Sequence, residues 1–275
     1  MKTFVNILLV ITTFFSGFMS QIDFMINPQK YNAVTLDISN LPAPVQTPEA
    51  DAYIELSEVK MHYLVYGTGE KAVVLVHGNG GSANSLKEAA RYLANDYTVY
   101  LPESRCHGSS SDPGVISYDL MAKDLNEFIE ALSIEKPVII GHSDGAINAV
   151  TLAALYPETP GAIIACGANS NPGTFKPYFP LGVWAKNLFK PDKLNDMMLT
   201  LPDFTPEFLA KVTCPAYIVS GQYDIMWLSD TVYIHENIKD SDMAVIKGAD
   251  HGSYISRDGR QAYVLSKSWL DGRGI

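Results

Sequence analysis

Short apolar runs alternate with longer segments of helical period along most of this chain of 275 residues. The runs are rich in valine and isoleucine and cover 72–76, 97–101, 137–140, 162–166, 216–220 and 243–246. The helix-like segments cover 85–95, 118–133, 146–156, 229–238 and 259–270. Strands buried on both faces read as continuous apolar runs, and parallel strands need crossover connections. The pattern therefore predicts an α/β domain with a mostly parallel central sheet and helices on both faces.

Two segments ahead of these runs have a different period. Residues 52–59 and 60–67 alternate between apolar and polar positions. Such alternation is typical of strands with one buried and one solvated face. We therefore expect an N-terminal antiparallel hairpin at the edge of the sheet, and an α/β domain that spans 51–275.

The first twenty residues differ from the rest. Lys2 is followed by an apolar stretch that has no further charge before Asp23. A basic start and such a stretch predict a secretory signal peptide over 1–20, although its length also suits an uncleaved N-terminal anchor. We expect a secreted or extracytoplasmic protein, with a membrane-anchored one as the alternative. Residues 21–50 have proline, few charges and no sustained period, which is typical of a leader or tether.

Composition narrows the range of partners. The chain has 30 acidic and 20 basic residues and a formal net charge of −10, which repels phosphate backbones, so no nucleic-acid partner is expected. Membrane association is expected through the N-terminus only. Of three cysteines, Cys166 ends one predicted strand and Cys214 precedes the next. About five strand rises, or roughly 15 Å, separate these two, so free thiols are expected.

The stretch VIIGHSDGA at 138–146 carries the strongest chemical signal. Ser143 stands between a predicted strand and a predicted helix, with glycine two positions away on either side. A serine on such a tight turn is exposed at the carboxyl end of the sheet, and the close approach of strand and helix leaves room only for small residues. The G-x-S-x-G pattern in this context predicts a nucleophile elbow.

A serine hydroxyl needs a base, and the base needs an acid that orients it. His251 and Asp224 each follow an apolar run, so both are expected at the same sheet edge as Ser143. Asp250 is adjacent to His251 and cannot readily fold back onto its ring, and Asp230 is assigned to the next helix. The predicted triad is Ser143, Asp224 and His251, in the chain order that this arrangement uses.

With these motifs in place, the sequence resembles the α/β-hydrolase family over about residues 51–272. VHGNGGSANS at 76–85 is similar to the H-G-x-x-x-S loop of that family, and LPESRCHGSSSD at 101–112 to its D-x-R-G-x-G-x-S loop. Glu103 and Cys106 stand where the family usually has Asp and Gly. These two departures affect the expected shape of the loop but involve no catalytic atom. The resemblance implies an α/β-hydrolase fold and a serine hydrolase of the esterase type.

The glycine-rich loop at 77–81 has a chemical role in this interpretation. Acyl transfer builds negative charge on the carbonyl oxygen, and preorganised backbone N–H groups stabilise it. The backbone amides of Asn79 and Asp144 are the expected oxyanion donors, with no role for the Asn79 side chain. Arg105 and His107 are expected to tie loops together below the site.

Residues 169–206 leave the strand–helix alternation and, in this family, an insertion at that place forms a short lid. His142 beside the nucleophile, and Phe179 and Trp184 in the insertion, are the candidates for lining the substrate pocket. An apolar underside of the lid favours an ester of small to medium size with an apolar part.

The sequence thus predicts a serine hydrolase, a carboxylesterase, that cleaves ester bonds through an acyl-enzyme. An acyltransferase or carbon–carbon hydrolase on the same triad, and a ligand-binding protein without turnover, are the alternatives that the scaffold leaves open. A small-molecule acyl compound is the expected partner. No spacing of His, Cys and Asp indicates a metal, and the chemistry requires no cofactor.

Overall fold

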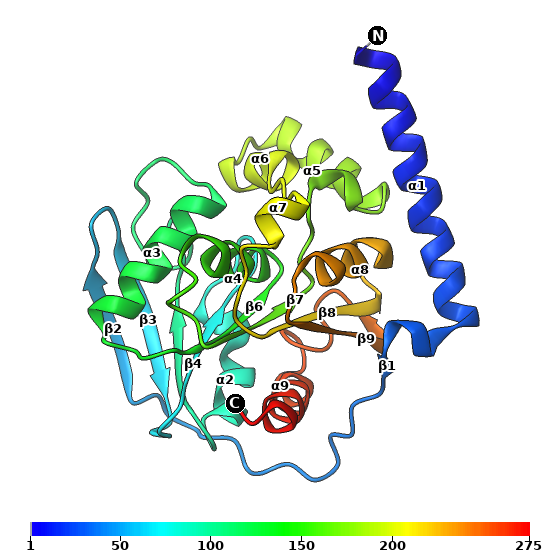
Figure 1. Ribbon diagram of the computed structural model, residues 1–275. Helices are drawn as coiled ribbons and strands as arrows, with labels where there is room; N and C mark the ends of the chain where they lie inside the picture. Colours follow the sequence, from blue (N-terminus) through cyan, green and yellow to red (C-terminus); the bar gives the residue numbers. More distant parts are fainter. Residues whose placement is uncertain (1) are drawn as a thin grey trace.

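The computed structural model describes residues 2–275 along the backbone, with side chains from residue 12 onward (Figure 1). Within these residues the strands form one sheet in the order β1-β9-β8-β7-β6-β4-β5-β3-β2. Their bounds are β1 (Ala33–Val34), β2 (Ala50–Glu55), β3 (Lys60–Tyr66), β4 (Ala72–Val76), β5 (Thr98–Pro102), β6 (Val138–His142), β7 (Ala162–Cys166), β8 (Ala216–Tyr223) and β9 (Ser241–Asp250). The pairs β2–β3 and β3–β5 are antiparallel and the others are parallel, which confirms the predicted sheet and its hairpin edge.

Helices cover both faces of this sheet. These helices are α2 (Lys87–Leu93), α3 (Tyr118–Ala131), α4 (Asp144–Leu155), α8 (Leu228–Asn237) and α9 (Gly259–Arg273). Val74 and Ile139 point toward α3, α4 and α8, whereas Val73 and Ile140 point toward α2 and α9. Neighbouring residues of one strand thus enter two different cores, which explains why the strands read as unbroken apolar runs.

The segment between β7 and β8 forms a cap over the carboxyl ends of the strands (Figure 1). It contains a short 3₁₀ helix, η3 (Pro172–Thr174), followed by α5 (Tyr178–Phe189), α6 (Lys193–Thr200) and α7 (Pro206–Leu209). η3, α5 and α6 fall in the stretch 169–206 for which the sequence predicts a lid, and α7 begins at the last residue of that stretch.

The leader contributes more structure than its sequence indicates. Residues 33 and 34 form β1 and pair in parallel with Val245 and Ile246 of β9. A two-residue strand has no period that could reveal it, because the pairing depends on a partner more than 200 residues away. Two further 3₁₀ helices are η1 (Pro28–Tyr31), in the leader, and η2 (Ala83–Leu86), before α2.

Helix α1 (Lys2–Ile26) lies beside the domain, and its second half packs against the start of α8. The rings of Phe14 and Trp227 meet edge to face at 5.7 Å, and the amide of Ser229 donates to the hydroxyl of Ser20 at 3.1 Å. Gly17 lies against Trp227, where any side chain would clash with the indole. The side chains of residues 2–11, in which much of the predicted signal peptide or anchor falls, lie outside the described part.

Across the described part of the chain, none of the helices combines the length and hydropathy needed to traverse a bilayer. The three cysteines are free, which confirms the prediction made for Cys166 and Cys214. Those two are buried, and Cys106 is partly exposed.

Candidate active site

Ser143 occupies the sharp turn between β6 and α4. Its φ of 55° and ψ of −119° are a strained conformation for a residue with a side chain. A side chain on Gly141 would clash with the backbone of Gly145, and one on Gly145 would clash with the backbone of Val76. The two glycines therefore permit the close contact of strand and helix that holds the serine in place.

The imidazole of His251 is fixed from below by Asp224. Its Nδ1 donates to Oδ1 of Asp224 at 2.6 Å, and the carboxylate also accepts from the amides of Gly221 at 3.0 Å and Ile225 at 2.8 Å. Burial alone would lower the pKa of His251, but the charge and hydrogen bond of Asp224 outweigh it and the pKa is raised. Burial would raise the pKa of Asp224, yet His251 and the two amides hold it below its usual value. The pair is arranged to stabilise an imidazolium.

The rival carboxylate, Asp250, faces away from the imidazole. Its Oδ1 accepts from the amides of Gly252 and Ser253, both at 3.1 Å, and it pairs with Arg257. These contacts shape the loop that carries His251. The geometry places Asp224, and not Asp250, against the ring.

The two expected oxyanion donors are joined through their own side chains. Asp144 is the first residue of α4, a position at which a backbone N–H has no acceptor within the helix. Its carboxylate accepts from Nδ2 of Asn79 at 2.9 Å and from the hydroxyl of Tyr118 at 3.0 Å. Burial raises the pKa of Asp144, and these two hydrogen bonds oppose that rise. Nδ2 of Asn79 also reaches the carbonyl of Leu194 in α6 at 3.1 Å.

The side chain of Asn79, for which no role was expected, therefore links the glycine-rich loop to α4 and to the lid. Neither this link nor the role of Tyr118 has a signal in the sequence, because the partners lie 65 and 26 residues from Asp144.

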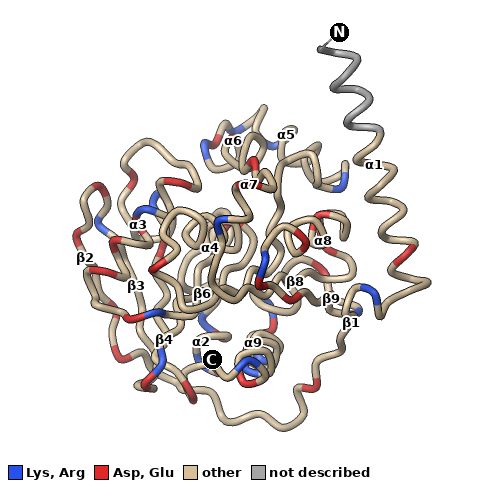
Figure 2. Tube along the Cα trace, viewed as in Figure 1, with Lys and Arg blue, Asp and Glu red and all other residues tan. Residues whose placement is uncertain are grey.

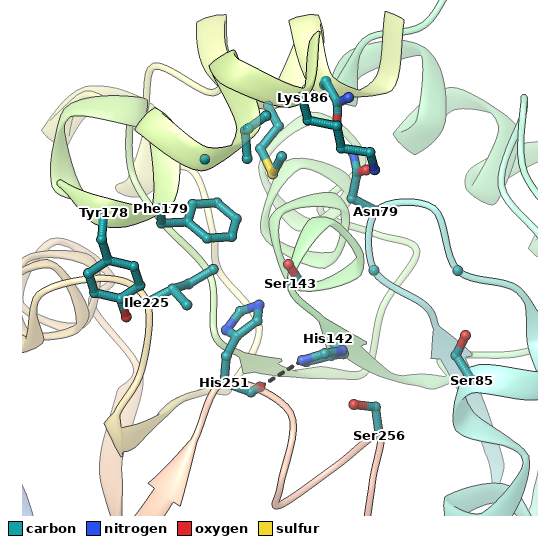
Figure 3. Close-up of a pocket in the computed structure, with 16 residues that line it drawn as sticks. Asn79, Ser85, His142, Ser143, Tyr178, Phe179, Lys186, Ile225, His251 and Ser256 are labelled. Atoms are coloured by element: carbon teal, nitrogen blue, oxygen red, sulfur yellow. Dashed lines mark hydrogen bonds between the residues drawn. The ribbon is translucent and has the colours of Figure 1, made fainter. Parts of the chain in front are cut away.

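His142 contacts the loop that carries His251. Burial, with the nearby charge of His251, lowers the pKa of His142 to about 4, so its ring is neutral at pH 7. Nε2 lies 2.8 Å from the backbone oxygen of His251 (Figure 3), and since a carbonyl only accepts, Nε2 carries the proton. The direct neighbour of Ser143 thus fixes the loop that carries His251, a contact between residues 109 apart that the motif alone does not reveal.

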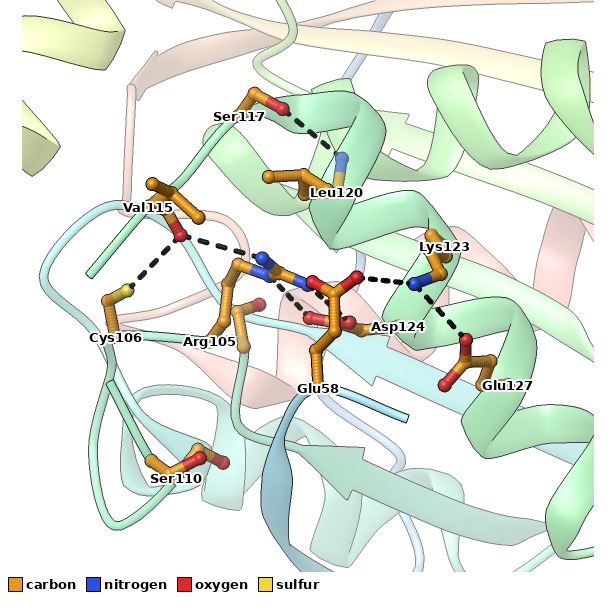
Figure 4. A network of polar contacts seen from close by, with 12 residues as sticks. Glu58, Arg105, Cys106, Ser110, Val115, Ser117, Leu120, Lys123, Asp124 and Glu127 are labelled. Carbon is orange, nitrogen blue, oxygen red and sulfur yellow. Dashed lines mark hydrogen bonds and ion pairs between the residues drawn. The ribbon is translucent and has the colours of Figure 1, made fainter. Parts of the chain in front are cut away.

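The loop after β5 is held by buried charges (Figure 4). Arg105 is fully buried and binds Asp124 through two hydrogen bonds of 2.7 Å, with a third, of 3.2 Å, to Glu58. Glu103 accepts from the amides of Ala83 at 3.0 Å and Ser109 at 2.5 Å. These contacts agree with the expected structural role of Arg105 in tying loops together.

Cys106 lies at the outer end of the same loop. Its thiol contacts Asp112 at 3.3 Å, and Asp112 pairs with Lys193 at the start of α6. The loop below the site and the lid therefore meet at this cysteine.

A cavity of about 580 Å³ opens above the serine (Figure 3). Ser143 and His251 line it together, and the glycine-rich loop borders it at Gly78, Asn79 and Gly81. On the lid side the lining consists of Tyr178, Phe179, Gly182, Val183, Lys186, Asn195 and Met198.

Two of the three candidate pocket residues, His142 and Phe179, line this cavity. Trp184 does not: its side chain lies on another face of α5 and is 55% exposed. The reason is that α5 is apolar nearly all round, so its sequence does not indicate which face turns inward. Among the described residues, no group of three or more His, Cys, Asp or Glu side chains could hold a metal ion.

The sequence is similar to those of known hydrolases. A family model described as alpha/beta hydrolase fold matches residues 71–205. The esterase YbfF of Escherichia coli (strain K12) is 38% identical over 93 residues, which are 34% of this chain and 37% of that protein. The serine hydrolase BPHL of Homo sapiens is 26% identical over 243 residues, or 76% of this chain and 82% of that one.

A solved structure matches almost the whole chain. The crystal structure of a membrane phospholipase A, described as a novel bacterial virulence factor, has a TM-score of 0.66 and covers 99% of both chains. The two sequences are 16% identical, so this likeness concerns the fold alone.

Proposed function

Since the chain belongs to the α/β-hydrolase fold family, we propose that it is a serine hydrolase that cleaves carboxylic esters of small to medium, partly apolar substrates. One observation carries the proposal. Ser143 is held at a strained turn and lines the same cavity as the imidazole of His251, and Nδ1 of that imidazole is bound to the buried carboxylate of Asp224. This arrangement suits activation of a hydroxyl for attack on a carbonyl.

The reaction would follow from the contacts of the site. Nδ1 of His251 is bound to Asp224, so Nε2 is free to take the proton of Ser143 as its oxygen attacks the ester carbonyl. The amides of Asn79 and Asp144 would stabilise the oxyanion. The imidazolium then protonates the leaving alcohol, and water repeats the steps on the acyl-serine.

The cavity supports a limit on substrate size. A volume of about 580 Å³ is in the range of small-molecule sites. Phe179, Val183 and Met198 give its lid side an apolar surface suited to an acyl chain. We also propose that the protein acts outside the cytoplasm, either exported with cleavage or held at the membrane by residues 1–20.

A series of activated esters of increasing acyl length tests the reaction, run with the native chain and with Ser143→Ala, each with and without an organophosphonate probe. We expect turnover by the native chain, one label per chain, and loss of both in the variant. Stoichiometric labelling without turnover of any ester would favour a ligand-binding protein. Product that forms only with an added alcohol or thiol would favour an acyltransferase. Turnover only of substrates that are cleaved at a carbon–carbon bond would favour a carbon–carbon hydrolase.

A further inference from the structure

Helix α5 presents two different faces. Phe179, Val183 and Lys186, spaced as i, i+4 and i+7, line the cavity. Leu181, Trp184 and Leu188 face away from it and are 64%, 55% and 61% exposed. Phe189, at the end of the helix, is 91% exposed. The helix has no buried residue along its length, so its outward apolar side chains lack a partner among the described residues.

An uncovered apolar helix on a lid indicates a binding surface. Soluble monomers rarely expose contiguous apolar patches of this kind, and such patches mark contacts with proteins or membranes. Tryptophan with aliphatic side chains on one side, and lysine beside them, is typical of helices that lie in the interface of a bilayer.

Charge favours the bilayer over a protein. Lys190 directly follows Phe189, the last residue of α5, and within the described residues it forms no ion pair. The chain as a whole carries a net charge of −10, with acidic and basic residues spread along its trace (Figure 2), so the lysine beside these exposed apolar side chains is a local positive charge on an acidic protein. Lysine ammonium groups at such a position attract anionic headgroups.

Helix α1 lies near the lid and also exposes apolar side chains. It packs beside η3, the short helix that leads into α5, and Figure 1 shows α1 and the lid helices at the same end of the molecule. Phe15, Phe18 and Met19 of α1 are 65%, 49% and 45% exposed. The sequence that precedes them has no charge back to Lys2.

We propose that the outward face of α5, together with the exposed side of α1, docks on a lipid bilayer with anionic headgroups. α5 walls the cavity with its other face, so docking brings the site next to the membrane. This inference rests on the proposed esterase function and narrows the substrate class to esters of acyl chains that partition into the bilayer.

The test compares two double variants of the full chain. Leu188→Glu with Phe189→Glu places two charges on the outward face, where neither residue lines the cavity. Tyr53→Glu with Val115→Glu changes two other exposed apolar residues, on β2 and in the loop before α3, and is the matched control. Each is assayed on p-nitrophenyl butyrate in solution and on a long-chain p-nitrophenyl ester in vesicles of phosphatidylcholine and phosphatidylglycerol.

We expect the α5 variant to lose about tenfold or more on the vesicle ester while its rate on the soluble ester stays within about twofold of the native chain. The control variant should keep both rates close to those of the native chain. Vesicles of phosphatidylcholine alone should slow the native chain.

Equal vesicle rates for the two variants would overturn the docking proposal. So would a native dimer in analytical ultracentrifugation that the α5 variant converts to monomer, because a second copy would then cover the face. If the native chain hydrolyses neither ester, the proposed function fails, and vesicle flotation of the two variants still decides whether α5 docks.

Discussion

A few atoms around Ser143 decide whether the site can work. Ser143 has a strained backbone, and His251 has one ring nitrogen bound to Asp224, so the proposed roles of both residues depend on their immediate neighbours. The sequence identifies these groups because their motifs are local. It misses the contact between Asn79 and Asp144, because nothing in a local pattern encodes a hydrogen bond across 65 residues.

Removal of either reacting group should abolish most of the activity. Replacing Ser143 or His251 with Ala should lower kcat by about 10⁴–10⁶, because members of a triad act as a unit. The double variant should be hardly slower than either single one, and the midpoint of denaturant unfolding should change little. Near-native ester hydrolysis by Ser143→Ala would contradict the proposed role of Ser143 as nucleophile.

The acid can be identified from a pH–rate series. His251 must be neutral to act as base, and its pKa is raised above that of free histidine. The kcat/KM of the native chain should therefore fall as the pH drops through this raised pKa. Asp224→Asn should lower kcat by roughly 10²–10⁴ and move this acidic limb to lower pH, because the charge that raises the pKa is gone.

Asp250→Asn is the control for that series. Its carboxylate binds loop amides and Arg257, so it should cost far less activity and leave the acidic limb in place. If Asp250→Asn were the more damaging change, the triad would have to be rebuilt around another carboxylate.

At the scale of elements, buried charges hold the loops that carry the site. Arg105 joins the loop after β5 to α3 through Asp124, with both side chains buried. Arg105→Met should lower the free energy of unfolding by about 3–5 kcal/mol, because it leaves the carboxylate of Asp124 buried and unpaired. Urea denaturation measures the change.

Lys123→Met is the matched control, because Lys123 also pairs with Glu58 but at the surface. It should lower the free energy of unfolding far less than Arg105→Met does, because solvent screens an exposed ion pair. Equal effects of the two variants would contradict the role given to the buried pair.

A second buried carboxylate ties the root of the lid to α8. Asp230 accepts from the amide of Ser170 at 2.9 Å and from the hydroxyls of Ser170 and Thr174 at 2.5 and 2.7 Å. Burial raises its pKa to about 6, against the opposing effect of these hydrogen bonds. The sequence places Asp230 in a helix, correctly, but gives no sign of this contact.

The pKa of Asp230 makes stability depend on pH. Because the folded pKa lies about 2 units above the unfolded one, the stabilisation is fully present below pH ~4 and is lost by pH ~6, a change of about 3 kcal/mol. The free energy of unfolding of the native chain, minus that of Asp230→Asn, should therefore fall over this range. A difference that stays constant with pH would show that Asp230 does not titrate there.

At the scale of the whole molecule, the sequence predicts the sheet and its two helical layers because each central strand is buried on both faces. Consecutive residues such as Val73 and Val74 enter opposite cores, so the whole strand must be apolar. It does not predict the leader strand β1 or the packing of Gly17 on Trp227. Both depend on partners that only the folded domain brings close.

The fate of the N-terminus follows from N-terminal sequencing of protein recovered from each cell fraction. If the segment is a signal peptide, exported protein should begin after about residue 16. Intact Met1 on membrane-bound protein would establish the anchor, and intact Met1 on cytoplasmic protein would contradict both.

Of the three thiols, Cys166 and Cys214 are shut inside the domain, whereas Cys106 is partly exposed and touches Asp112, the partner of Lys193 at the start of α6. A fluorescent maleimide should therefore attach to Cys106 alone on the native chain, with no engineered cysteine. The natural sequence thus provides a labelling site at the contact between the core and the lid. Fluorescence of a label on Cys106 can then follow opening of the lid in real time.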